Sequence, residues 1–138
     1  MEPKIINGNC HFDQRGTLLY NNEFDASLIK RIYIIENESP QFIRGWQGHK
    51  IEQRWFSVVS GKFKIQLIKI DDWENPSINL QVVTYLIDAD KLNVLHVPQG
   101  YISSIQSLEL NSKLLVMADY LLGETQDEYR YDIDYFKI

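Results

Sequence analysis

The sequence has little of what marks secreted, membrane or zinc-finger proteins. It contains one cysteine, Cys10, which cannot form an internal disulfide or a zinc site alone. No apolar run approaches the ~20 residues that a membrane helix needs. The first ten residues also lack the apolar core of a signal peptide. These absences predict a cytoplasmic protein with no membrane segment.

Positive charge is also scarce. Fourteen Lys and Arg stand against 19 Asp and Glu, which gives a net charge of −5. Proteins that bind nucleic acids without specificity neutralise phosphates, so this charge argues against a nucleic-acid partner. The negative net charge is still compatible with a small anionic ligand that is bound by two or three arginines.

Repeats, low-complexity tracts and Pro/Gly/Ser-rich linkers are absent as well. A chain of 138 residues with 44% hydrophobic side chains can bury one sizeable core. We therefore expect a single domain over residues 1–138.

The apolar residues that are present recur with period two, which is typical of β-strands. Ser60-Gly61 is a tight hairpin signal between two such segments. Longer loops, with room for a helical turn, are expected at 71–79 and 86–93. Nine or ten short strands in one domain predict an all-β sandwich or barrel. The predicted strands are 29–36, 53–60, 62–70, 80–88, 93–97 and 112–122.

The stretch "RGWQGHK" (44–50) gathers polar side chains next to apolar ones. Alternation along a regular strand places one set on a ligand-facing side. The opposite side, with Trp46, Lys50, Glu52, Arg54 and Phe56, is then expected to face solvent or an interface. On the earlier strand, Arg31 and Tyr33 project together and are expected to enter the same cavity. The ligand-facing set is Gln47, His49, Ile51, Gln53, Trp55 and Ser57.

The order R-G-x-polar-x-H, then "SG", then P-x-G resembles the cupin superfamily, which has a double-stranded β-helix, or jelly-roll barrel. The resemblance aligns the metal-ligand positions of cupins with Gln47, His49, Gln53 and Ser103. One imidazole, two amides and a hydroxyl make a poor ligand set for iron, manganese or zinc. We therefore expect a cupin pocket without a metal or another cofactor.

A closer resemblance is to the sugar 3,4-ketoisomerase family, relatives of the deoxysugar 3,5-epimerases. The motifs that carry it occur in order along nearly the whole chain. They are "FDQRGTL" (12–18), "IKRIYII" (29–35), "RGWQGHK" (44–50), "QRWFSVVSG" (53–61), "VLHVPQGY" (94–101) and "DEYRYDIDYF" (127–136).

The resemblance implies a dTDP-linked 4-keto-6-deoxyhexose as substrate and proton transfer at the carbons beside its ketone. It implies that Arg44 holds the diphosphate, that Arg31 and Tyr33 line the pocket, and that His49 is the general base. A histidine can take a proton from one carbon and return it to the next.

The sequence departs from the family at Gln47, where the motif has its first histidine. The resemblance implies that this first histidine is the base of the 3,5-epimerases. Because an amide cannot act as a base, we do not expect efficient 3,5-epimerisation from this chain. The Gln47 amide could instead donate to the developing oxyanion. Gln53, Tyr101 and Ser103 are further candidates for substrate contacts, with packing or internal hydrogen bonds as their alternatives.

Three interpretations follow. The first is an isomerase in deoxysugar biosynthesis for a surface polysaccharide. The second is a protein that binds a nucleotide sugar without turnover, and the third is a metal cupin with a depleted site. A relative of the 3,5-epimerases is a further alternative to the isomerase. The resemblance also implies a homodimer, in which the segment around "GTLLYNNEF" (16–24) could be exchanged. His96 is expected to be structural, His11 to lie on the surface, and 127–136 to pack on the barrel without a functional role.

Overall fold

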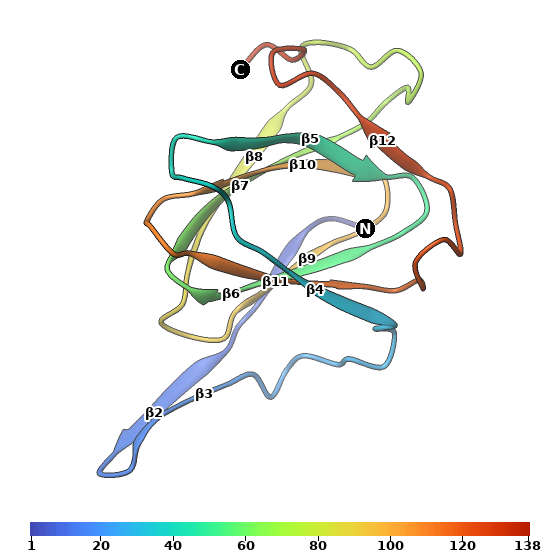
Figure 1. Cartoon of the computed structure of the whole chain (residues 1–138). Helices are drawn as coiled ribbons and strands as arrows, with labels where there is room; N and C mark the ends of the chain where they lie inside the picture. The colour runs from blue at the N-terminus through green and yellow to red at the C-terminus, as the bar shows by residue number, and fades with distance from the viewer.

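The structure, a computed structural model, describes residues 1–138 and consists of strands, turns and loops (Figure 1). All strand pairs are antiparallel, and two five-stranded sheets have the orders β1-β9-β6-β11-β4 and β12-β5-β10-β7-β8. The all-β prediction is confirmed. The strands are β1 Lys4–Ile6, β2 Asn9–Asp13, β3 Gly16–Tyr20, β4 Arg31–Ile35, β5 Ile43–His49, β6 Arg54–Ser60, β7 Lys62–Lys69, β8 Val82–Asp88, β9 Val94–Val97, β10 Tyr101–Ser107, β11 Lys113–Ala118 and β12 Glu128–Arg130.

Each of the six strands predicted by range is present, shortened at one or both ends. The predicted turn at Ser60-Gly61 joins β6 to β7, and Gly61 has a φ of 76°, which glycine adopts without strain. The predicted loop over 86–93 begins too early, because β8 continues to Asp88 along its partner β7. Neither expected loop contains a helical turn. No helix in the structure could cross a membrane.

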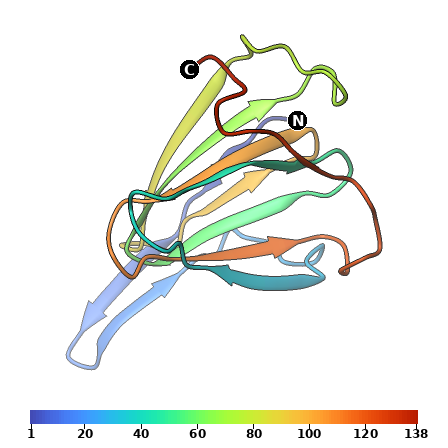
Figure 2. The same cartoon turned by 45° about the horizontal axis from the view of Figure 1, so that its top comes forward.

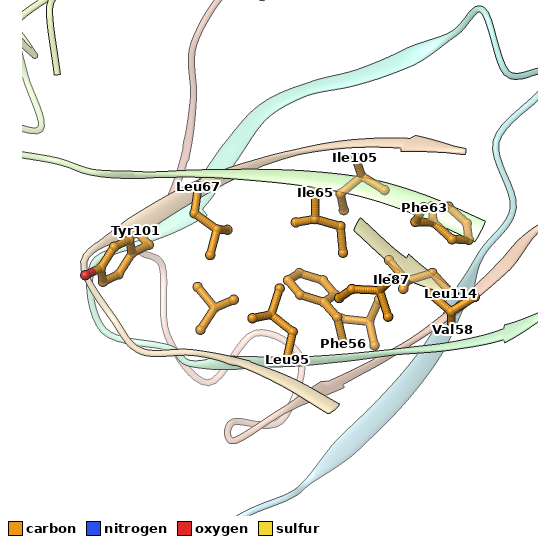
Figure 3. Packing of buried hydrophobic residues seen from close by; sticks show 12 residues of the cluster. Phe56, Val58, Phe63, Ile65, Leu67, Ile87, Leu95, Tyr101, Ile105 and Leu114 are labelled. Atoms are coloured by element: carbon orange, nitrogen blue, oxygen red, sulfur yellow. The ribbon is translucent and has the colours of Figure 1, made fainter. Parts of the chain in front are cut away.

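The core lies between the two sheets, where every second side chain of each strand points inward. Figure 3 shows this cluster, with Tyr101 at one end and Phe63 at the other. Burying one aliphatic or aromatic side chain stabilises the fold by about 1.5–3 kcal/mol. The cluster comprises Phe56, Val58, Phe63, Ile65, Leu67, Ile87, Leu95, Val97, Tyr101, Ile105, Leu114 and Val116.

The C-terminal segment covers the outer face of the second sheet. Phe136 packs edge-on against Trp46 at 5.6 Å between ring centroids, and the Tyr131 hydroxyl donates to the carbonyl of Trp73 at 2.6 Å. The prediction that 127–136 packs on the barrel is thus confirmed. Trp46 is 1% exposed because this segment covers it, so its expected exposure to solvent or an interface is wrong.

The hairpin of β2 and β3 extends away from both sheets (Figures 1 and 2). His11 lies on it, exposed as predicted. The hairpin is joined to the first sheet through β1, which pairs with β9.

Candidate functional site

A cavity of about 820 Å³ opens between the sheets. Its apolar wall is formed by Phe56, Val97, Tyr101 and Ile105, which also belong to the core cluster. Its polar wall comes from β4, β5 and the start of β6, and from the segment that leads into β12. The packed core therefore supports one side of a polar pocket.

Strand β5 brings Arg44, Gln47 and His49 to this cavity. Gly48, between the last two, lies against β10. A side-chain Cβ at this position would stand 2.2 Å from the Tyr101 carbonyl oxygen and 2.5 Å from the Ile102 Cα. The glycine in "RGWQGHK" therefore allows β10 to approach and holds His49 at the mouth of the barrel.

His49 is mostly buried, and both of its ring nitrogens face charged groups. Arg54 Nη2 lies 2.9 Å from His49 Nε2. A guanidinium group can only donate, so Nε2 is the acceptor and the proton of the neutral ring is on Nδ1. His49 Nδ1 lies 3.5 Å from Asp127 Oδ1 and 4.0 Å from Glu52 Oε2. The ring thus presents a lone pair on Nε2 and a proton toward two carboxylates.

Asp127 is fixed by the backbone that follows β5. One of its oxygens accepts from the N–H groups of Ile51 and Glu52, at 2.5 and 2.9 Å, and the Thr125 hydroxyl lies 3.0 Å from the other. Burial disfavours the charged carboxylate, but these donors outweigh it and lower the pKa of Asp127 to about 2. Asp127 is therefore a fixed anion beside His49.

The pKa of His49 is lowered from its ordinary value. Burial is the main cause, followed by the positive charge of Arg54, while Glu52 and Asp127 act in the opposite direction. The imidazole is therefore neutral at neutral pH. A neutral ring with an accepting nitrogen is the form that a general base needs.

Arg54 is 7% exposed and has a partner for most of its N–H groups. It donates to the Tyr33 hydroxyl at 3.2 Å, to Glu52 Oε1 at 3.0 Å and to the carbonyl of Gln53 at 3.1 Å. The Glu52 carboxylate compensates its charge, as a buried cation requires. The guanidinium group is therefore held rigidly beside His49.

Two further arginines line the cavity with donors to spare. Arg31 lies over the ring of Tyr33, at 4.9 Å from its centroid, and its buried Nε has no hydrogen-bond partner. Arg44 Nε donates to Asn37 Oδ1 at 3.3 Å. Planar guanidinium groups with free N–H donors bind phosphate oxygens well. This wall of the cavity can accept an anion.

The structure brings seven of the eight predicted site residues to one cavity. The prediction that Arg31 and Tyr33 enter it together is confirmed, and Tyr101 both lines it and packs in the core. The seven are Arg31, Tyr33, Arg44, Gln47, His49, Tyr101 and Ser103.

Gln53 is the exception, and its predicted place in the pocket wall is wrong. Its amide nitrogen donates to Asp119 Oδ2 at 3.1 Å, and its oxygen lies 2.7 Å from His96 Nε2, on the other face of the first sheet. The reason is that β5 ends at His49 and β6 begins at Arg54, in the opposite sheet. The crossing reverses which alternate residues point inward.

The same reversal explains the residues that the sequence analysis missed. Glu52, Arg54 and Phe56 were expected on a solvated or interface side, yet they line the cavity. Asp127 was assigned to a segment without a functional role, yet it contacts the loop after β5 and faces His49. For Glu52, Arg54 and Phe56, the only signal in the sequence is that the strand alternation stops after "GHK". No signal in the sequence marks Asp127.

Gln47 lines the cavity near its exposed rim. Its amide nitrogen donates to the Glu128 carboxylate, which also pairs with Arg130 at 3.0 Å. The Ser103 hydroxyl lies 3.5 Å from the carbonyl oxygen of Gln47. The Gln47 side chain therefore has a partner at the rim, Glu128, which is the cross-strand neighbour of His49.

His49, Glu52 and Asp127 offer three possible metal-ligand atoms within 4.8 Å of one another. Of the four positions that the cupin resemblance aligned with metal ligands, this group contains only His49. The Arg54 guanidinium contacts His49 Nε2 and Glu52 Oε1, whereas His49 Nδ1 faces Asp127 Oδ1 and Glu52 Oε2. The nearby positive charge of Arg54 disfavours a divalent cation in this group.

A comparison with known protein families assigns the chain to one family. A family model described as "FdtA: WxcM-like, C-terminal" matches residues 1–138. No curated protein sequence matches the chain.

Solved structures of similar fold include two 3,4-ketoisomerases and a 3,5-epimerase. A 3,4-ketoisomerase from Helicobacter canadensis is 22% identical over 98% of this chain and 95% of its own, with a TM-score of 0.73. A variant of the 3,4-ketoisomerase QdtA from Thermoanaerobacterium thermosaccharolyticum, in complex with TDP-4-keto-6-deoxyglucose, is 24% identical over 97% and 91%, with a TM-score of 0.71. The dTDP-4-dehydrorhamnose 3,5-epimerase of Bacillus anthracis is 15% identical over 88% and 74%, also with a TM-score of 0.71.

These likenesses confirm the predicted cupin-type fold. The family model covers every residue of the chain and agrees with the resemblance to sugar 3,4-ketoisomerases. The chain belongs to the FdtA family.

Proposed function

We propose that the protein is a metal-independent 3,4-ketoisomerase of a dTDP-linked 4-keto-6-deoxyhexose, within deoxysugar biosynthesis for a surface polysaccharide. Residues 1–138 act as one cupin domain in this proposal. The observation that carries it is the state of His49, which faces the cavity with an accepting Nε2 and turns Nδ1–H toward two carboxylates. Two proteins of similar fold support this substrate class: QdtA, whose variant binds TDP-4-keto-6-deoxyglucose, and the dTDP-4-dehydrorhamnose 3,5-epimerase.

In this reaction His49 Nε2 removes the proton from C3 of the sugar. The electrons of the C3–H bond form a C3=C4 double bond, and those of the C4 carbonyl move to its oxygen. The proton on O3 then passes to O4, C3 becomes the ketone, and His49 returns its proton to C4. Asp127 and Glu52 stabilise the imidazolium that exists between the two transfers.

The diphosphate binds to Arg31 and Arg44 in this proposal. Both lie on the cavity wall, and Arg31 Nε is buried without a partner. Tyr33, Tyr101 and Ser103 form further parts of the wall around the substrate. The enediolate oxygen needs a donor, and both Gln47 and Arg54 lie on the cavity wall with N–H groups.

The test is proton exchange. Incubation of the protein with dTDP-4-keto-6-deoxyglucose in heavy water, followed by NMR, should show deuterium at C3 or C4 and a new 3-keto sugar. The His49→Asn variant should lose both signals, while His96→Asn, altered on the other face of the sheet, should keep them.

Other outcomes select the alternatives. Deuterium at C3 and C5 without a 3-keto product would indicate an epimerase. Saturable binding without exchange would indicate a nucleotide-sugar-binding protein, and absence of both would contradict the proposed substrate class.

We also propose that the protein forms a homodimer through the β2–β3 hairpin and the edge strand β4. Phe12 and Leu18 on the hairpin are 78% and 60% exposed, and Ile32 and Ile34 on β4 are 65% and 53% exposed. An exposed apolar edge strand is a common pairing surface. Light scattering should give twice the chain mass, and Ile32→Lys together with Ile34→Lys should give the monomer. A monomeric wild-type protein would contradict this proposal.

A further inference from the structure

The guanidinium group of Arg54 uses four of its five N–H groups in contacts with neighbouring residues. Of the five N–H groups of its guanidinium, one points to Tyr33, two to Glu52 and the Gln53 carbonyl, and one to His49. One N–H on Nη2 has no partner, and this nitrogen lies on the same cavity wall as His49. The group is thus anchored on one side and has a free donor on the other.

The position of Nη2 matches the chemistry of proton abstraction beside a ketone. The atom that loses the proton and the atom that carries the oxygen are neighbours in the sugar. A base and an oxyanion donor must therefore lie side by side, each roughly 3 Å from its target. The 2.9 Å between His49 Nε2 and Arg54 Nη2 places an acceptor and a charged donor in this relation.

Gln47 fits this task less well. Its amide nitrogen already donates to Glu128 at the exposed rim, and it carries no charge. Donors that carry a charge form stronger hydrogen bonds to an oxyanion than neutral amides do. Arg54 is also kept in place by Glu52 and by Tyr33, so little reorganisation is needed as charge develops.

We propose that Arg54 is a catalytic residue, which exchanges its contact with His49 Nε2 for the C4 oxygen of the sugar when His49 takes the C3 proton. This inference rests on the proposed ketoisomerase function. In the return step the same donor follows the negative charge to O3, the neighbouring oxygen. Arg54 thus takes the oxyanion role that the sequence suggested for Gln47.

The experiment compares Arg54→Gln, Arg54→Lys and Gln47→Ala with the wild-type protein, with dTDP-4-keto-6-deoxyglucose as substrate. For Arg54→Gln we expect kcat to fall about 10²–10³-fold and KM to stay within about threefold. Arg54→Lys, which keeps a charge, should recover part of the loss. Gln47→Ala should lower kcat less than Arg54→Gln does. Affinity for dTDP alone should be unchanged in all three.

Arg54→Gln leaves Glu52 as an unpaired buried carboxylate and can fail to fold. The double variant Glu52→Gln/Arg54→Gln removes both charges, so it should fold, and its kcat should be lower than that of Glu52→Gln alone. NMR titration of the His49 ring gives a second readout. Three charged groups face this ring: Arg54, Glu52 and Asp127. Loss of the cation alone should raise the pKa of His49.

The outcomes separate the two proposals. A wild-type protein that does not isomerise the sugar overturns the ketoisomerase function and this inference with it. An active wild type whose Arg54→Gln variant keeps kcat within tenfold, or loses only dTDP affinity, overturns the role of Arg54 alone. A loss of kcat in Gln47→Ala that exceeds the loss in Arg54→Gln returns the donor role to Gln47.

Discussion

His49 on β5 faces the cavity between the sheets, whereas His96 on β9 lies on the outer face of the first sheet, and the two show how one residue type acquires two roles. Both have a pKa lowered mainly by burial. His96 stacks on Trp55 at 4.8 Å, and its Nε2 lies 2.7 Å from the side-chain oxygen of Gln53. Because the Gln53 amide nitrogen donates to Asp119, its oxygen faces His96, and His96 Nε2 must donate.

The two rings are therefore opposite tautomers. His96 donates through Nε2 into a closed set of partners outside the cavity, whereas His49 accepts through Nε2 beside the cavity. The difference originates in adjacent residues, because Gln53 points to one face and Arg54 to the other. Burial alone does not make a histidine a base; the partner that fixes its tautomer and the access to ligand do.

We expect the largest difference between the two histidines when each is replaced by asparagine. His49→Asn should lower the rate of sugar isomerisation by about 10³-fold or more, since general base catalysis contributes 10²–10⁴-fold. His96→Asn should lower the melting temperature and leave kcat within about threefold. NMR turnover assays and thermal unfolding measure the two effects, and equal losses of kcat would contradict the distinction.

Asp127→Asn should have the next largest effect. The amide oxygen can still accept from the Ile51 and Glu52 N–H groups, so the loop keeps its shape, but the anion beside His49 is gone. We expect kcat to fall about 10–100-fold. Because Asp127 raises the pKa of His49 and Arg54 lowers it, the acid limb of kcat/KM should move to lower pH in Asp127→Asn and to higher pH in Arg54→Gln. Shifts in the same direction would contradict this arrangement.

Gln53→Ala tests the outer face of the first sheet, where His96 lies. The change leaves His96 Nε2–H and Asp119 without their side-chain partner, which should lower the free energy of unfolding by about 1–3 kcal/mol. Denaturant unfolding measures the loss. The kcat should stay at the wild-type value, and a fall comparable to that of Asp127→Asn would place Gln53 in the site after all.

The smallest expected effect concerns the rim. Glu128→Gln removes the carboxylate that accepts from Gln47 and pairs with Arg130, both near solvent. Exposed ion pairs contribute about 0–1 kcal/mol, so stability should hardly change. Arg130 then loses its counter-charge, and affinity for dTDP should rise slightly in calorimetry at low salt. A weaker affinity would show that Glu128 itself contacts the ligand.

Much of the site was predictable where a strand stays regular. Arg31 and Tyr33 share a face of β4 because they are two residues apart, and Gln47 and His49 share a face of β5 for the same reason. The motif order of the family supplied the proposed role of His49. Prediction failed just after His49, because alternation cannot be carried through a loop that changes sheets.

The amino-acid sequence was enough to predict the all-β class, the turn at Ser60-Gly61 and which alternate residues of β4 and β5 face the cavity. These follow from the two-residue repeat of a strand and from local turn chemistry, which act over a few positions. The partners of His49 depend on the tertiary fold. The crossing between sheets turns Arg54 inward, and Asp127 reaches the loop after β5 from 76 residues away in the chain. Packing of the two sheets brings such distant groups together, and no local pattern encodes it.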